Sequence, residues 1–174
     1  MAINDISQYF TLDNGTQIAN DNTFASLAAN TRIKNKNSGS TFIKNSNYSN
    51  VFERKFVYDY KGILDVNRMR EAAKLLEGKH DFKSFCGNKR MKKSTVRTIY
   101  EIKIEELPGE LKISYTGNGF LMNMVRILTG TLIEVGDGRR TPESMTDILE
   151  GLDRELAGYT APPQGLMLEQ VYYE

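Results

Sequence analysis

Residues 117–136, GNGFLMNMVRILTGTLIEVG, are the longest apolar stretch of this 174-residue chain and decide how the rest can fold. Their length and flanking glycines predict a helix that starts near Phe120 and ends at Gly136. Because its residues are apolar nearly all round, we expect this helix to be buried on most sides. The run is shorter than the roughly 20 apolar residues of a membrane span, and it carries Asn123, Arg126 and Glu134.

One narrow stripe of this helix is polar or small. Asn123, Arg126 and Gly130 follow one another at spacings of three and four residues, so they share one side of the helix. The stripe predicts either the wall of a pocket or a crossing with another helix. Arg126 itself has two interpretations. It is either a structural arginine that reaches solvent or pairs with a carboxylate such as Asp81 or Glu134, or a functional arginine that lines a cleft.

The composition of the chain predicts one domain with a tail. A chain of 174 residues can bury one substantial core but is short for two domains of ordinary size. Lys and Arg number 23 against 22 Asp and Glu, so any nucleic-acid binding must come from local clusters. The single cysteine, Cys86, excludes an intrachain disulfide and is expected as a small buried residue. The first ten residues lack a secretion-signal pattern, so we expect a cytoplasmic protein.

Residues 1–49 are rich in Asn, Ser and Thr and are expected to be a tail or linker. Within them, residues 8–19 could form a hairpin, since Asn14-Gly15 suits a type I′ turn. Residues 30–50 hold too few apolar side chains to offset the entropy of ordering, which favours a flexible linker. The folded domain is therefore expected to span residues 50–174.

From residue 52 onward, strand patterns and helix patterns follow one another. Residues 52–60 predict a strand, and Asp65 is a suitable cap for a helix whose apolar stripe reaches Leu76, with Gly78 at its end. Residues 96–105 alternate as a half-buried strand, with Thr98, Tyr100 and other even-numbered residues on the buried face. A turn at residues 108–109 leads into a return strand.

Two more elements follow the central helix. Thr141-Pro142 predicts the start of another helix that Gly151 breaks or ends, and residues 166–173 read as a last strand that completes the sheet. The order of elements predicts an α+β domain with a mainly antiparallel sheet and helices packed on one face.

A basic loop, defined here as residues 87–97, is a local exception to the neutral charge balance. Five cations fall within nine residues, and such a loop is either ordinary solvated surface or a site for several phosphates. The loop at residues 136–140, GDGRR, adds two more cations to the candidate RNA-binding set. That set is Lys89, Arg90, Lys92, Lys93, Arg97, Arg139 and Arg140.

Four motifs together resemble the C-terminal domain of the tRNA pseudouridine synthase A (TruA) family. They are KHDFKSFC, STVRTIYEIKI, GNGFLMNMVRILTGTLIEVGDGRR and AGYTAPPQGLMLEQVYY, and they cover about residues 50–173. The resemblance implies the pseudouridine synthase fold, no cofactor or metal, and a homodimer whose basic clefts hold the anticodon stem-loop of tRNA. It also implies that Arg126 lines the catalytic cleft and pairs with the catalytic aspartate. The residues implied for the uridine pocket are Asn123, Leu166, Leu168 and Phe82.

The sequence departs from the family pattern in one respect. Family members carry the catalytic aspartate in a separate N-terminal domain, in a GRTDAGVH-like motif, and before residue 50 this chain has only Asp5, Asp13 and Asp21 as acidic residues. A guanidinium cannot replace the aspartate, because it is neither a nucleophile nor a base. We therefore expect the chain to be inactive alone and to act with a separate chain that supplies the missing domain. The alternatives are a non-catalytic RNA-binding or dimerisation module and a degenerate fragment.

Overall fold

The computed structural model describes residues 37–44 and 56–171, and these form an α+β fold, as predicted. The predicted hairpin at residues 8–19 lies outside the described residues. Two short 3-10 helices accompany the main elements, η2 (Lys83–Phe85) and η3 (Arg154–Leu156). The main elements in chain order are β1 (Asn37–Lys44), β2 (Tyr58–Asp59), α2 (Val66–Leu76), β3 (Gly78–Asp81), β4 (Val96–Leu107), β5 (Glu110–Gly117), α3 (Met124–Gly136), α4 (Ser144–Gly151) and β6 (Leu166–Val171).

The strands form one six-stranded sheet, which is mainly antiparallel as predicted. Its order is β2-β1-β5-β4-β3, and β6 pairs with β1. Only the short β1–β2 pairing is parallel among the described strands. The last strand therefore joins the sheet, although it lies beside β1 and not beside the β4–β5 hairpin.

Strand β1 corrects one expectation from the sequence, because residues 37–44 were expected to be linker. They pair with β5 along their whole length, and residues 37–41 also pair with β6. Thr41 and Ile43 are buried, with exposed fractions of 2% and 0%. The segment has few apolar residues, so its strand conformation depends on neighbours on both sides and not on local propensity.

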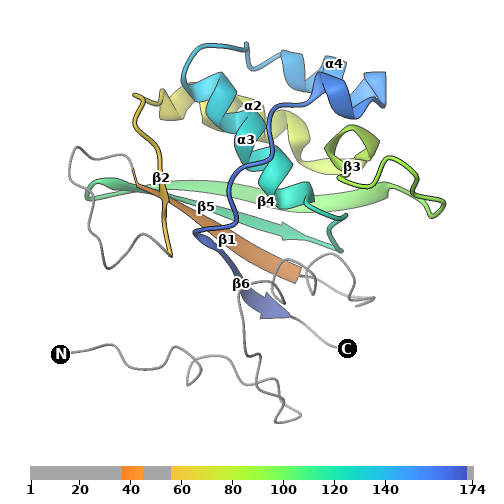
Figure 1. The fold of residues 1–174 in the computed structure, drawn as a ribbon, viewed down its shortest axis with the longest axis horizontal. Coiled ribbons are helices and arrows are strands. Elements are labelled where there is room, and N and C mark those ends of the chain that lie inside the picture. Colours follow the sequence, from red (N-terminus) through yellow and green to blue (C-terminus); the bar gives the residue numbers. More distant parts are fainter. Residues whose placement is uncertain (1–36, 45–55, 172–174) are drawn as a thin grey trace, which may run out of the picture.

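Helices α2, α3 and α4 lie on the same face of the sheet, as predicted (Figure 1). Every residue of α3 is buried except Arg126 and Glu134. The hydroxyl groups of Tyr115 on β5 and Thr129 on α3 lie 2.9 Å apart and join this helix to the sheet. No helix in the described residues is long and apolar enough to cross a membrane.

Helix α3 starts later than the sequence pattern suggested, at Met124 and not near Phe120. Asn123 has a φ of 58°, in the left-handed region, which prevents the helix from extending backwards through it. Phe120 and Leu121 are buried all the same, so the apolar pattern marked burial correctly and the helix start incorrectly.

Helix α2 confirms its predicted cap. The side chain of Asp65 accepts hydrogen bonds from the backbone N–H groups of Asn67 and Arg68. The helix ends at Leu76, and Gly78, which was expected just beyond it, is the first residue of β3 with a φ of 107°.

Strand β4 corrects the predicted alternation. The pairing of β4 with β5 shifts between Ile99 and Glu101, so the buried face carries Ile99, Ile102 and Ile104 while Tyr100 is 52% exposed. A β-bulge of this kind inserts one residue and reverses the side-chain order beyond it. Gly117 lies opposite, where a Cβ atom would come within 2.8 Å of the carbonyl oxygen of Thr98.

Two remaining boundaries also differ. Within the strand predicted at residues 52–60, the described strand is only Tyr58–Asp59, and residues 52–55 lie outside the described part. Helix α4 begins at Ser144, after a turn in which its N–H bonds to the carbonyl oxygen of Thr141, and it ends at Gly151 as predicted.

Candidate functional site

Arg126 lies in the first turn of α3 and is only partly buried. Its Nε donates a hydrogen bond to the carbonyl oxygen of Ala161 at 2.7 Å, and its Nη1 donates to Oδ1 of Asn123 at 3.2 Å. Asn123 has a left-handed backbone conformation and directly precedes α3, three residues before Arg126. One neighbour from the preceding turn and one that is 35 residues away in sequence therefore fix the direction of the guanidinium.

The segment that supplies Ala161 is an extended strap, defined here as residues 157–161. The N–H of Ala161 donates back to the carbonyl oxygen of Arg126 at 3.0 Å, and the N–H of Gly158 donates to Oγ1 of Thr131 at 3.0 Å. A Cβ atom on Gly130 would lie 1.9 Å from the carbonyl oxygen of Tyr159. Where it carries Arg126 and Gly130, the polar and small stripe of α3 packs against the strap and not against another helix.

No carboxylate pairs with Arg126 among the residues that the structure describes. Asp81, one candidate partner, accepts hydrogen bonds from Oγ1 of Thr95 and the N–H of Lys83. Glu134, the other candidate, forms ion pairs with two other arginines. Burial lowers the pKa of Arg126 from its usual value, although a guanidinium stays charged at neutral pH.

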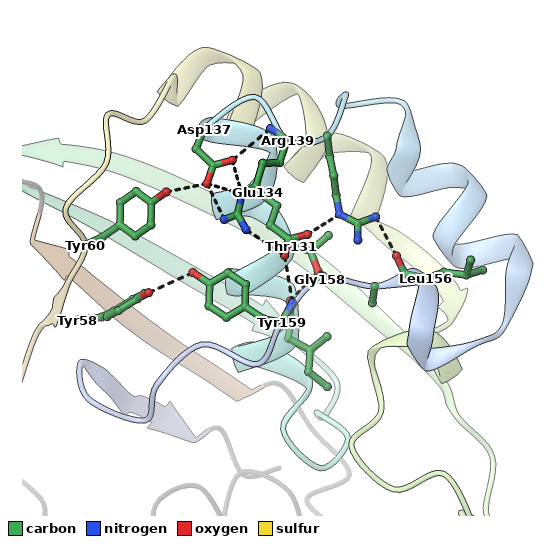
Figure 2. Close-up of polar contacts among 12 residues, drawn as sticks. Tyr58, Tyr60, Thr131, Glu134, Asp137, Arg139, Leu156, Gly158 and Tyr159 are labelled. Atoms are coloured by element: carbon green, nitrogen blue, oxygen red, sulfur yellow. Dashed lines mark hydrogen bonds and ion pairs between the residues drawn. The ribbon is translucent and has the colours of Figure 1, made fainter.

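Glu134 holds the strap from the other end of α3. Its carboxylate pairs with Nε of Arg140 at 2.5 Å, and its Oε1 accepts a hydrogen bond from the N–H of Tyr159 at 3.4 Å. Figure 2 shows Glu134 at the centre of a polar cluster that also includes Asp137 and Arg139. Arg140 extends the cluster by donating to the carbonyl oxygen of Leu156.

Asp137 and three tyrosines complete this polar cluster. Tyr60 donates its hydroxyl to Oδ2 of Asp137 at 2.6 Å, and Arg139 pairs with the same carboxylate at 2.6 Å (Figure 2). Burial acts to raise the pKa of Asp137, but hydrogen bonds from Arg139 and Tyr60 outweigh it and bring the pKa below its usual value. The Arg139 guanidinium also lies 5.8 Å from the ring centre of Tyr159, whose hydroxyl contacts that of Tyr58.

This cluster engages Arg139 and Arg140, two of the predicted RNA-binding residues. Both engage carboxylates of α3 or of the loop after it, and the Arg140 side chain is 27% exposed. Five cations remain on the basic loop, where four are exposed and the fifth, Arg97, bonds to the carbonyl oxygens of Ser94 and Val96.

The basic loop starts beside the Arg126 site. The N–H of Gly87 donates to the carbonyl oxygen of Met122 at 2.8 Å, and a Cβ atom on Gly87 would lie 3.0 Å from Nδ2 of Asn123. Within the loop, Lys89 forms an ion pair with Glu155. The structure thus brings together Arg126, Asn123 and the basic loop, which are separated in sequence.

The residues expected to form a uridine pocket do not all reach the surface. Phe82 is 0% exposed and packs against His80 and Phe85, so it supports the site from the core and does not line its surface. Asn123, Leu166 and Leu168 are partly exposed. Leu166 and Leu168 share one face of β6, the strand that follows the strap, because they are two residues apart.

The contacts of three contributors to this site could not be predicted from local patterns. The carbonyl oxygen of Ala161 is a backbone group, and the roles of Glu134 and Tyr159 depend on how the strap lies against α3. Among the described residues, no group of three or more His, Cys, Asp or Glu side chains could hold a metal ion.

Comparisons with known proteins cover most of this site. A family model described as tRNA pseudouridine synthase matches residues 72–174. The tRNA pseudouridine synthase A of Bacillus subtilis is 47% identical over 133 residues, which are 76% of this chain and 54% of that protein. A Geobacillus protein of the same name is 48% identical over 124 residues, 71% of this chain and 50% of that protein. The chain thus spans about half the length of the curated relatives it matches.

Proposed function

Because this chain belongs to the tRNA pseudouridine synthase family, we propose that it forms the RNA-facing half of a cleft that converts uridine to pseudouridine in the anticodon stem-loop of tRNA. The observation that carries the proposal is the geometry of Arg126. Its guanidinium is partly buried, is held by Ala161 and Asn123, and has no carboxylate partner in the described chain. Such a guanidinium can form an ion pair with a carboxylate from another segment.

The chemistry explains why an arginine is useful there. Isomerisation breaks the bond between C1′ of the ribose and N1 of the base, turns the base, joins C1′ to C5 and releases the C5 proton. The family resemblance assigns the key step to an aspartate. A partly buried arginine next to that carboxylate would lower its pKa and keep it ionised and oriented at neutral pH.

The aspartate must come from another segment. The 174 residues contain no GRTDAGVH-like motif, and the match covers about half of the relatives. We place the aspartate on the half of the family's length that this chain does not match, supplied by a separate chain or a further segment. A homodimer of the complete assembly would then present two clefts.

RNA contacts are assigned by charge and position. The basic loop begins beside Asn123 at Gly87, and its exposed cations face solvent, which suits phosphate contacts. Leu166 and Leu168 supply apolar surface for the uracil ring. Arg139 is 53% exposed and can add a contact at the edge of the cleft, although it is held by Asp137.

A tritium-release assay tests the enzymatic proposal. Unmodified tRNA labelled with tritium at C5 of uridine loses the label when pseudouridine forms. We expect no release with this chain alone and release when the unmatched half of the Bacillus subtilis relative is added as a separate chain. Turnover by this chain alone would show that it carries its own catalytic acid.

Variants of Arg126 separate binding from chemistry in the same assay. Arg126→Gln keeps a side-chain donor for Ala161 but removes the charge, so we expect release to stop in the complemented mixture while tRNA affinity changes little. Lys74→Gln, an exposed position on α2, is the matched control and should retain release. Equal rates for Arg126→Gln and the control would contradict the proposed role of Arg126.

The second candidate function is a non-catalytic RNA-binding or dimerisation module. It is favoured by the exposed side chains of Lys92 and Lys93, for which the described structure shows no partner. In that case the chain would bind tRNA with steep salt dependence, and the complemented mixture would release no tritium. Tritium release by the complemented mixture therefore distinguishes the two candidate functions.

A further inference from the structure

We propose that a cavity beside the basic loop binds a backbone phosphate of the RNA, next to the nucleotide that faces Arg126, and that Arg154 is its innermost cation. The proposal rests on the proposed function in taking RNA as the ligand. It adds a second contact point, outside the Arg126 site, that includes residues from parts of the chain with no basic cluster in their sequence.

The cavity is built by three separate segments. The basic loop forms one side, η2 contributes Lys83, and residues 152–154 between α4 and η3 form the opposite side. Cys86 is buried, and its Sγ lies 3.6 Å from Sδ of Met91; both residues line the cavity and give it an apolar part. The cationic lining residues are Lys83, Lys89, Lys92, Lys93 and Arg154.

The charge balance of the cavity favours an anion. Five cations face two carboxylates, Asp81 and Asp153. Asp81 already accepts from Thr95 and from the N–H of Lys83, and Asp153 accepts from the N–H of Glu155. The exposed ion pair of Lys89 with Glu155 has side-chain exposures of 68% and 72%, so it can open at little cost.

Arg154 joins this cavity to the strap. Its Nη1 donates to the carbonyl oxygen of Ala157 at 3.3 Å, and its Nη2 donates to Oγ1 of Thr160 at 3.2 Å. A guanidinium has five N–H donors, so further donors are available for a phosphate in the paired geometry that arginine favours. Thr160 precedes Ala161, whose carbonyl oxygen holds Arg126.

Two walls of the cavity connect it to the Arg126 site. The basic loop begins at Gly87, which contacts Met122 and Asn123, and the opposite wall connects through Arg154 to the strap. A strand of RNA that places one nucleotide at Arg126 would therefore bring a flanking phosphate to the cavity. Arg90 belongs to the same loop but does not line the cavity.

The salt dependence of tRNA binding tests the proposal. The slope of log affinity against log salt is negative, and each lost phosphate contact should reduce its magnitude by about 0.7 to 0.9. For the full chain with an unmodified tRNA transcript, we expect Lys93→Gln and Arg154→Gln each to reduce the magnitude of the slope by about that amount. Lys74→Gln, at an exposed position on α2 that does not line the cavity, is the matched control and should leave the slope unchanged.

The pattern of outcomes distinguishes this proposal from the proposed function. If Arg90→Gln reduces the magnitude of the slope while Lys93→Gln and Arg154→Gln do not, RNA contacts the outer face of the loop. The cavity proposal is then wrong, although the proposed RNA binding stands. If the unaltered chain does not bind tRNA even at low salt, both fail.

A second measurement avoids dependence on the folding of the Arg154 variant. In nitrogen-15 NMR spectra of the unaltered chain, the Nε–Hε signal of Arg154 should shift in a saturable manner when inorganic phosphate replaces chloride at constant ionic strength. Lys93→Gln should weaken the response, and Arg90→Gln should retain it. An Arg154 signal that does not respond to phosphate would overturn the assignment.

Discussion

Arg126 and Ala161 hold each other by two hydrogen bonds across 35 residues of sequence. The Nε of Arg126 donates to the carbonyl oxygen of Ala161 at 2.7 Å, and the N–H of Ala161 donates to the carbonyl oxygen of Arg126 at 3.0 Å. The strap and the first turn of α3 are therefore linked at this point by both backbone and side-chain groups. Any change in the strap is expected to change the direction of the guanidinium.

Replacing Arg126 with Leu tests the structural side of this relationship. Ala161 is 1% exposed, so its carbonyl oxygen would lose its charged donor without gaining water. Removal of a partly buried charge offsets part of that loss, and we expect the free energy of unfolding to fall by about 1 kcal/mol. Urea unfolding followed by circular dichroism measures it. An Arg126→Leu chain as stable as the unaltered one would mean that this bond contributes nothing net.

Replacing Gly130 with Ala tests the close approach of the strap to α3. The new Cβ atom would meet the carbonyl oxygen of Tyr159 at 1.9 Å, and backbone must move to relieve the clash. We expect a loss of about 2 kcal/mol or more, despite the better helix propensity of Ala.

Gly151→Ala is the matched control for that experiment. Its Cβ atom would meet Cδ1 of Leu156 at 2.1 Å, but this is the end of a side chain that is 43% exposed and can rotate away. We expect Gly151→Ala to change stability by less than about 0.5 kcal/mol. Equal losses for the two variants would contradict the assigned role of Gly130.

The low pKa of Asp137 predicts a pH dependence of stability. Because the pKa is lower in the folded chain than in the unfolded chain, the contribution of Asp137 is present above about pH 4 and is lost as the pH falls through the folded value. Asp137→Asn should therefore be less stable than the unaltered chain at pH 7, with a gap that narrows at pH 3. Glu71→Gln, an exposed position on α2, should show a gap near zero at both pH values. A gap for Asp137→Asn that is equal at pH 7 and pH 3 would be inconsistent with this linkage.

The ion pair of Lys89 with Glu155 predicts a gain in RNA binding. Glu155→Gln would remove the carboxylate that engages Lys89 and would also reduce repulsion of phosphate. We expect tRNA affinity to rise by about 2-fold to 5-fold at low salt, with little change in stability because the pair is exposed. Filter binding at two salt concentrations measures the effect. Unchanged or weaker binding would remove Lys89 from the RNA contacts.

Local patterns predicted the elements that carry their own signal. The cap at Asp65, the buried stripe of α2, the β4–β5 hairpin and the burial of α3 follow from side-chain periodicity and helix-end chemistry, which act over a few residues. The bulge between Ile99 and Glu101 was missed, because the alternation is regular in sequence and only the pairing with β5 breaks it.

The candidate site was predicted in part. Arg126 and the basic loop stood out because a charge in an apolar helix and five cations in nine residues are visible in one dimension. The involvement of Glu134, Ala161 and Arg154 could not be seen there. Their partners lie on elements that meet only when the strap packs along α3 and residues 152–154 approach the basic loop.

The sequence by itself therefore determined the family, the fold class and the identity of the central arginine, since these depend on motifs and on periodic burial. The tertiary structure decided the rest. Residues 37–44 form a strand between β5 and β6. Glu134 forms ion pairs with Arg139 and Arg140, and Arg126 bonds to a carbonyl oxygen instead of a carboxylate. The physical reason is that hydrogen bonds and ion pairs are chosen by proximity in space, which a local pattern does not encode.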